Sequence, residues 1–204
     1  MSMVTTTTLK TYLPEITGDV ANAALGDLLD RVECAVARWL GWPAPSTTAD
    51  AQLDATTYTF FLDGPTYSRH DVIRLPVRPV NSITSIHSDV NRQYGSDTLI
   101  DSTTYDLDKL NGLVILDPVN ATDYFDNGYR AIKVVCNAGY QSSYLPADIE
   151  HAVCVWASQL HRNKATQGKD SITQRAATVS ISPKKMPVEV KEILTRYRSP
   201  QNYL

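Results

Sequence analysis

The run from Ala131 to Lys164 constrains the fold of this 204-residue chain more than any other segment. An apolar segment from Ile132 to Cys136 has the composition of a β-strand, and Asn137-Ala138-Gly139 ends it. A polar loop follows, and Pro146 then stands at a first helical position, where a backbone N–H is not needed. A strand, a glycine corner and a proline-started helix in close succession predict a mixed α and β fold.

The helix that begins at Pro146 has a wide apolar surface. Its main stripe has helical spacing and consists of Ile149, Ala152, Val153, Trp156, Ala157 and Leu160. Cys154 and Val155 extend this surface beyond one face of the helix. We expect a helix of this kind to be central in its domain, or to contact another subunit as well.

Two further segments have the periodicity of helices. In residues 17–44 the apolar stripe consists of Leu25, Leu28, Leu29, Val32, Ala35, Val36, Trp39 and Leu40. Thr17 or Asp19 is the expected N-cap of this helix, and Gly41 is expected to end it. Residues 187–204 contain a short amphipathic helix that begins at Pro187.

Two segments lack a sustained period. Residues 1–16 contain four consecutive threonines, and Pro14 interrupts any helix there, so we expect an N-terminal arm. Residues 166–186 are rich in Gln, Ser, Thr and Lys, and this composition predicts a flexible linker before the final helix.

Between residues 45 and 140 the pattern changes from helical to strand-like. Five or six short runs of β-forming residues are separated by turn residues, and Asn111-Gly112 between two of them is a strong hairpin signal. We therefore expect an inserted antiparallel β subdomain, as a sheet, sandwich or barrel. The predicted fold class is α+β. A small bundle of the N-terminal helix, the helix in 141–165 and the C-terminal helix carries the β insert.

Composition excludes several classes of protein. With 43% hydrophobic and 20% charged residues, the chain suits one globular domain or one core with an inserted subdomain. A net charge of −3 argues against a basic face for sequence-specific nucleic-acid binding. No apolar run approaches membrane-spanning length and no secretion signal is seen, so we expect no membrane segment. In a reducing cytoplasm Cys34, Cys136 and Cys154 are expected to be free buried thiols.

Residue patterns of catalytic and cofactor sites do not occur, and we expect no enzymatic activity, no cofactor and no metal. His151 and His161 share a helix but are separated by about 15 Å, too far to bind one metal ion. Asp106 and Asp108 lie on the same side of an expected strand, where two carboxylates can share a divalent cation or simply face solvent. A hydrolase centred on these two residues is a minor hypothesis.

Three groups of residues together match a known pattern. The first helix contributes Leu25, Leu28, Leu29, Ala35 and Gly41; the strand contributes Ile132, Val134, Ala138, Gly139 and Tyr140; the next helix begins with Pro146, Ala147, Asp148, Ile149, Ala152 and Val153. This order resembles the head–tail connector (adaptor, or head-completion) family of long-tailed bacteriophages, over residues 9–165. The β segment is longer than in compact members of that family, which leaves its role open.

The resemblance implies a virion structural protein at the head–tail junction, the neck, made in the host cytoplasm. Such proteins form a homo-oligomeric ring, usually of twelve subunits, below the portal protein. The ring extends the channel for genomic DNA, which passes without sequence-specific binding, and offers a platform to a head-closure or tail-completion protein. The residues expected at the ring interface are Leu28, Val32, Trp39, Val155 and Trp156.

In such proteins the C-terminal segment typically docks on the portal, and a short helix after a linker fits that role. The expected docking residues are Val190, Ile193, Leu194, Tyr197 and Arg198. The alternative is that this helix packs on its own domain. If it docks, removal of residues 185–204 leaves the fold intact and abolishes portal binding. A different functional hypothesis is a β-rich binding module that recognises a carbohydrate or a host protein.

Overall fold

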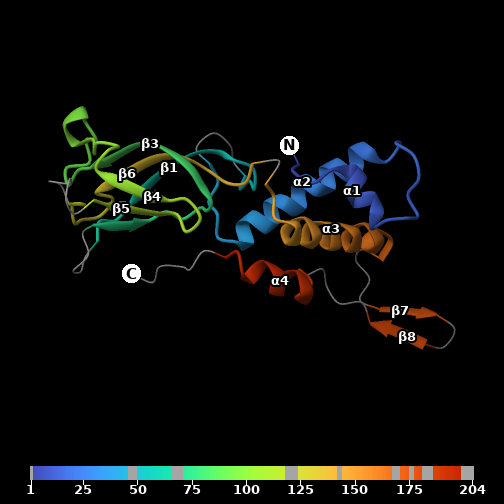
Figure 1. Ribbon diagram of the computed structural model, residues 1–204. Coiled ribbons are helices and arrows are strands. Elements are labelled where there is room, and N and C mark those ends of the chain that lie inside the picture. The colour runs from blue at the N-terminus through green and yellow to red at the C-terminus, as the bar shows by residue number, and fades with distance from the viewer. Residues whose placement is uncertain are drawn as a thin grey trace. The chain divides into compact units, whose positions relative to one another are not determined.

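The computed structural model describes residues 2–45, 50–65, 71–117, 124–141, 144–166, 171–174, 177–180 and 186–198. The chain forms two compact units, which we name the helical unit (1–36 and 145–198) and the β unit (37–144). Figure 1 shows the helices gathered in the first unit and two small sheets in the second. The predicted α+β class is therefore confirmed.

The N-terminal segment differs from the predicted arm. Helix α1 (Thr6–Thr11) begins after Thr5, whose side chain accepts a hydrogen bond from the Thr8 N–H at 3.0 Å. Leu9 and Leu13 are fully buried, so this segment belongs to the core of the helical unit. The threonine run that suggested a tail instead supplies the N-cap of a helix.

Helix α2 (Asn22–Trp39) begins a few residues later than the sequence predicted. Gly18 has a φ of +79°, which is outside the helical region. The chain then turns through a 3.0 Å hydrogen bond from the Asn22 N–H to the Asp19 carbonyl. Beyond this turn most of the predicted stripe is buried, and the buried residues include Leu25, Leu29, Val32 and Val36. The apolar face of α2 therefore forms one wall of the helical unit's core.

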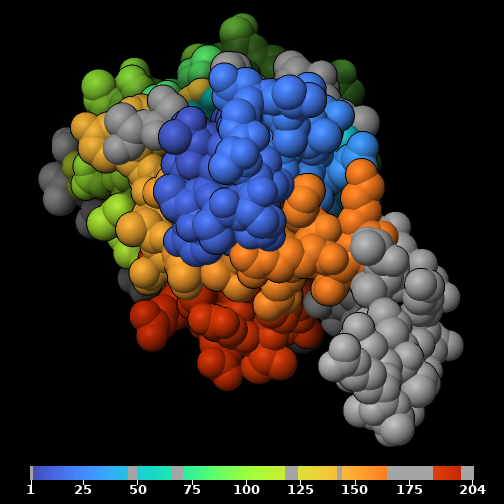
Figure 2. All heavy atoms as spheres, turned by 90° about the vertical axis from the view of Figure 1, so that its right-hand side faces the viewer, coloured from blue at the N-terminus to red at the C-terminus, as the bar shows by residue number. Residues whose placement is uncertain are grey.

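Helix α3 (Ala147–Arg162) begins directly after Pro146, as predicted. Its buried residues lie on more than one side of the helix and are Ile149, Ala152, Val153, Cys154, Ala157 and Ser158. Figures 1 and 2 show α3 between α1 and α2 on one side and α4 (Val188–Thr195) on the other. The wide apolar surface of α3 therefore has neighbours on two sides within its own unit.

Two antiparallel three-stranded sheets form the β unit, one in the order β1-β6-β3 and the other in the order β2-β5-β4. The strands are β1 (Thr56–Leu62), β2 (Val72–Arg74), β3 (Val80–Ser88), β4 (Tyr105–Asp108), β5 (Leu113–Leu116) and β6 (Ile132–Ala138). Alternate residues of β6 are buried, beginning at Ile132, because successive side chains of a strand point to opposite faces. The predicted antiparallel β insert is confirmed.

The predicted hairpin joins β4 to β5. Gly112 has a φ of +64°, as the turn requires. The Asp108 carboxylate accepts hydrogen bonds from the Asn111 side-chain amide at 2.7 Å and from the N–H groups of Leu110 and Asn111. These hydrogen bonds lower the pKa of Asp108, and the one from the Asn111 side chain has the largest effect. Asp108 therefore stabilises the turn of its own hairpin.

The corner at Gly139 brings two backbone segments into close contact. Gly139 has a φ of +112°, and a Cβ at this position would lie 2.6 Å from the Asp54 carbonyl oxygen. The following residue, Tyr140, donates its N–H to the Leu53 carbonyl and accepts a hydrogen bond from the Ala55 N–H. Glycine is the residue that allows both this conformation and this approach.

The C-terminal part contains two short antiparallel strands, β7 (Ser171–Gln174) and β8 (Ala177–Ser180), followed by α4. Both strands lie within the predicted linker, 166–186, although this segment has no sustained period in the sequence. Residues 167–170, 175–176 and 181–185 of this segment lie outside the described residues, as does 199–204. Helix α4 follows Pro187, as predicted. Within the described ranges, no helix is long and apolar enough to cross a membrane.

Candidate assembly surfaces

The Glu33 side chain of α2 forms hydrogen bonds with the first residues of the chain. Its carboxylate accepts hydrogen bonds from the Ser2 hydroxyl at 2.6 Å, the Met3 N–H at 3.0 Å and the Val4 N–H at 2.8 Å. Burial raises the pKa of Glu33, and the three hydrogen bonds act in the opposite direction. A buried carboxylate needs such partners, and here they fix the start of the chain against α2.

A second group of contacts joins the N-terminal segment to α3. The Tyr12 hydroxyl lies 2.8 Å from Nδ1 of His151. The Arg162 guanidinium donates to the Tyr12 carbonyl at 2.8 Å and to the Glu15 carboxylate at 3.1 Å. His151 therefore has a structural partner in Tyr12. Together with Glu33, these contacts make residues 2–16 part of the helical unit.

The residues predicted for a ring interface differ in accessibility. Val32 is 1% exposed and belongs to the core of the helical unit, so it does not reach a partner in this conformation. The other four are half-buried and keep part of their surface, and they are Leu28, Trp39, Val155 and Trp156. Their role in a ring stays a prediction.

Two of the five residues predicted to dock on the portal are buried within the chain. Val190 and Leu194 are fully buried where α4 packs on α3. The Tyr197 hydroxyl donates a 3.4 Å hydrogen bond to Asp148 of α3. Helix α4 therefore packs on its own unit, the alternative that the sequence left open. Ile193 and Tyr197 are half-buried, and Arg198 is exposed.

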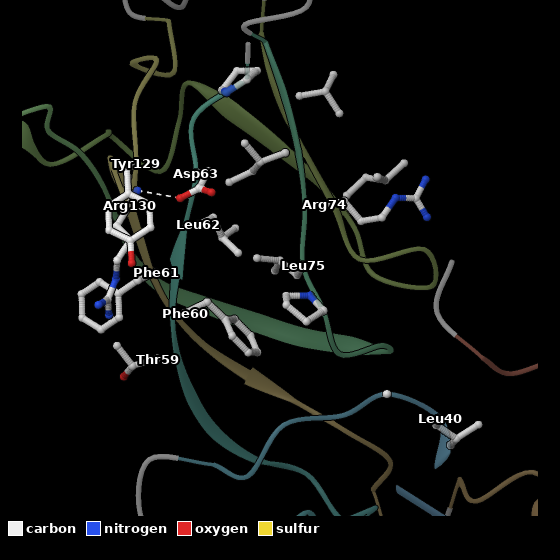
Figure 3. A pocket seen from close by; sticks show the side chains of 16 residues that line it. Leu40, Thr59, Phe60, Phe61, Leu62, Asp63, Arg74, Leu75, Tyr129 and Arg130 are labelled. Carbon is white, nitrogen blue, oxygen red and sulfur yellow. Dashed lines mark hydrogen bonds between the residues drawn. The ribbon is translucent and has the colours of Figure 1, made fainter. Parts of the chain in front are cut away.

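The β unit contains a groove of about 790 Å³, which Figure 3 shows from close by. The last residues of β1, the whole of β2 and the segment around Arg130 line it. Phe60, Ile73 and Leu75 are buried and provide apolar walls. A volume of this size lies within the range of ligand-binding sites in proteins.

Two cations and two aromatic rings form an aromatic–cation row beside this groove, in the order Arg130, Phe61, Tyr94, Lys133. The Arg130 guanidinium lies 4.5 Å from the centre of the Phe61 ring, whose centre is 5.5 Å from that of the Tyr94 ring. The Lys133 amino group lies 5.5 Å from the centre of the Tyr94 ring. Tyr94 and Arg130 both have a φ of +52°, and such backbone in residues other than glycine is often found at functional sites.

Sequence reasoning missed this groove and its aromatic–cation row. Phe61, Tyr94 and Arg130 come from three separate segments, and no spacing in the chain connects them. The one available signal was the abundance of tyrosine, 11 residues against 3 phenylalanines, which is typical of interface surfaces.

The carboxylates and thiols among the described side chains belong to the types that bind metal ions or act as nucleophiles. No group of three or more His, Cys, Asp or Glu residues able to hold a metal ion occurs among them. The carboxylate of Asp108 is hydrogen-bonded within its hairpin, and Asp106 is exposed. All three cysteines are free. Burial raises the pKa of the Cys136 and Cys154 thiols to about 12, so both are protonated at neutral pH.

No known sequence family matches the chain, and no curated protein matches it in sequence. Its fold does match solved structures. One is a chain in the neck of an empty gene transfer agent particle, computed with C6 symmetry, with a TM-score of 0.56 and 19% identity over 91% of this chain and 82% of that chain. Another is in the virion of a native gene transfer agent particle, with a TM-score of 0.54 and 20% identity over 91% and 81%.

The chain has the fold of these particle proteins. Because the likeness covers 91% of the chain, the part left out is smaller than either of the two units. The β unit therefore belongs to the shared fold together with the helical unit. Sequence identity of 19 to 20% accompanies the likeness, which is consistent with the absence of a match by sequence.

Proposed function

We propose that this protein is a structural subunit of the neck of a phage-like particle, where it forms the adaptor ring below the portal. The observation that carries the proposal is the fold likeness to a chain in the neck of a gene transfer agent particle. That likeness includes the long β unit, whose role the resemblance to connector proteins left open. A structural role without an enzymatic step also fits the chemistry of the described side chains.

The proposed ring repeats one contact between unlike surfaces around an axis until it closes. The half-buried apolar residues Leu28, Trp39, Val155 and Trp156 are the proposed contact residues of the helical unit. A ring of twelve subunits is compatible with the C6 symmetry with which the matching neck was computed. The net charge of −3 suits a channel through which DNA slides, because a strongly basic lining would hold its phosphates.

Portal docking is proposed for the accessible part of the C-terminal segment. Val190 and Leu194 hold α4 on α3, which places Ile193 of this helix, and Tyr197 and Arg198 just after it, in an ordered segment. A docking surface that is already ordered loses less conformational entropy on binding than a disordered one. The head-closure or tail-completion protein is the proposed partner on the opposite side of the ring.

Native mass spectrometry and negative-stain microscopy test this function directly. The full chain is mixed with the portal protein of the same particle, and rings of twelve subunits on the portal are expected. Val155→Asp places a charge at the proposed contact and is expected to abolish rings, because a buried unpaired charge is unfavourable. Gln159→Asp, an exposed position on the same helix, is the matched control and is expected to leave rings intact.

Circular dichroism and thermal unfolding of both variants separate loss of assembly from loss of folding. A folded Val155→Asp variant that still forms rings would remove Val155 from the interface. The ring proposal itself fails if the wild-type chain remains monomeric in the presence of the portal.

A further inference from the structure

The groove in the β unit follows the edges of two strands. It is lined by consecutive residues of β1, including 60–62, and by every residue of β2, 72–74. Successive side chains of a strand point to opposite faces, so a cavity that touches consecutive residues lies beside the edge of the strand. Figure 3 shows residues of both strands around this groove, with Phe60, Phe61 and Leu62 from β1 and Arg74 from β2.

These two edges have no further strand beside them in the described part of the chain. β1 pairs with β6 and β2 pairs with β5, so one sheet ends at β1 and the other ends at β2. An edge strand presents N–H and C=O groups with which another strand can pair. β1 has seven residues and β2 has three, so β1 offers the longer edge.

The charge of the groove differs from that of the unit around it. Residues 37–144 contain twelve acidic and eight basic residues, whereas the charged lining of the groove is Arg74, Arg130 and the single carboxylate of Asp63. Asp63 accepts a 2.7 Å hydrogen bond from the backbone N–H of Arg130, which leaves the Arg130 guanidinium over the Phe61 ring. Acidic side chains on a ligand therefore complement this lining.

The apolar walls define the rest of the ligand. Phe60, Ile73 and Leu75 are buried within the unit, while Phe61 is 39% exposed and Tyr129 is 68% exposed. Figure 3 shows Phe61, Tyr129 and Arg130 together on the side of β1, and Arg74 on the side of β2. A ligand strand that alternates apolar and acidic residues places its apolar side chains toward the apolar walls and its acidic side chains toward solvent and the two arginines.

We propose that this groove binds an extended, acidic peptide segment of another protein, which adds to the edge of β1 at residues 60–62 as a further strand. Backbone hydrogen bonds to β1 give affinity, and the apolar walls with Arg74 and Arg130 select an alternating apolar and acidic sequence. The partner protein is taken to be a component of the particle, and this assignment rests on the proposed neck function, whereas the binding of the peptide does not.

The test uses the full chain and a fluorescein-labelled ten-residue peptide that alternates glutamate with valine and isoleucine. Fluorescence anisotropy measures binding, and amide hydrogen exchange with site resolution reports where the peptide lies. A peptide with lysine in place of every glutamate tests the charge. Two versions methylated on the backbone nitrogens of odd or even residues test for strand pairing, since they keep the side chains and remove the donors.

The glutamate peptide is expected to bind and to slow amide exchange in residues 60–62. Loss of binding by tenfold or more is expected for the lysine peptide and for at least one methylated version. Arg74→Glu and Arg130→Glu are each expected to weaken binding by about tenfold. Lys109→Glu, an exposed position of the β unit outside the groove lining, is the matched control and is expected to bind as the wild type does.

Unchanged amide exchange in 60–62, binding of both methylated peptides as tight as that of the unmethylated glutamate peptide, or equal effects of Lys109→Glu and the arginine variants would each overturn the proposal. Displacement of the peptide by single-stranded oligothymidine at equal or lower concentration would assign the groove to a nucleic acid instead. Neither ring formation nor the portal enters this experiment, so its failure and that of the proposed function are separate results.

Discussion

Gly139 is the residue on which the corner of the β unit depends. Its φ of +112° and the 2.6 Å separation between a hypothetical Cβ and the Asp54 carbonyl oxygen exclude side chains there. The backbone hydrogen bonds of Tyr140 to residues 53 and 55 follow directly from this approach. The sequence predicted that a strand ends at this glycine, and the contact with Asp54 explains why the position cannot carry a side chain.

Gly139→Ala is expected to lower the free energy of unfolding by about 2–5 kcal/mol, from the left-handed conformation and from displacement of the Asp54 backbone. Urea denaturation of the full chain measures this change. Gly26→Ala is the matched control: Gly26 lies within α2, and a Cβ there meets no atom within 4 Å. Its expected effect has the opposite sign, a gain of up to about 1 kcal/mol. Equal stability of Gly139→Ala and the wild type would contradict this account of the corner.

The role of Asp108 could not be predicted from its position in the sequence. Its spacing from Asp106 suggested a shared cation, and both positions do lie on β4. The hydrogen bonds of Asp108 to Leu110 and Asn111 appear only once the hairpin has formed. The same residue pattern therefore serves a turn here, because a carboxylate beside a tight turn finds backbone N–H donors locally.

At the scale of elements, α4 is the helix whose role the structure changes most. Its amphipathic pattern was predicted from sequence, but a pattern does not tell which surface an apolar face contacts. The structure buries Val190 and Leu194 against α3 in the same unit. Removal of residues 185–204 is therefore expected to destabilise the helical unit, in contrast to the intact fold that the docking hypothesis predicted.

Leu194→Ala measures this contribution without truncation. It is expected to lower the free energy of unfolding by about 2–5 kcal/mol, because a fully buried leucine is replaced by a cavity. Val188→Ala, at a position that is 70% exposed in the same helix, is the matched control and is expected to change stability by less than about 0.5 kcal/mol. If both variants unfold at the same urea concentration as the wild type, α4 does not support the core.

Helix α1 is an element that the sequence did not predict. A helix of six residues gains too little from its own hydrogen bonds to form alone, and a threonine run gives no helical period. Burial of Leu9 and Leu13, and the hydrogen bonds of Glu33 to the preceding residues, supply the missing free energy. Only the folded helical unit provides these partners, so the sequence alone favoured an arm.

At the scale of the whole molecule, each of the two cores contains one buried cysteine, whose reactivity can be measured. Cys136 lies in the core of the β unit and Cys154 in that of the helical unit, and burial raises the pKa of both thiols to about 12. At pH 8 both thiols are protonated, and the thiolate is the reactive form. We expect neither residue to react with a thiol reagent in the native full chain, while Cys34, which is half-buried, reacts faster.

Mass spectrometry of the labelled protein assigns the modified cysteine, and labelling in urea is the control in which all three react. Rapid labelling of Cys154 in the native chain would show that the helical unit opens around α3. Rapid labelling of Cys136 would show the same for the β unit.

The sequence by itself determined where the principal elements lie. Apolar periodicity, Pro146, Pro187 and Asn111-Gly112 act over a few residues, so three helices and five or six strands could be predicted from local signals. The tertiary structure alone decided which surfaces are covered: α4 on α3, Glu33 around the chain start, and the groove between the edges of β1 and β2. Burial depends on contacts between residues distant in the chain, and no local pattern encodes them.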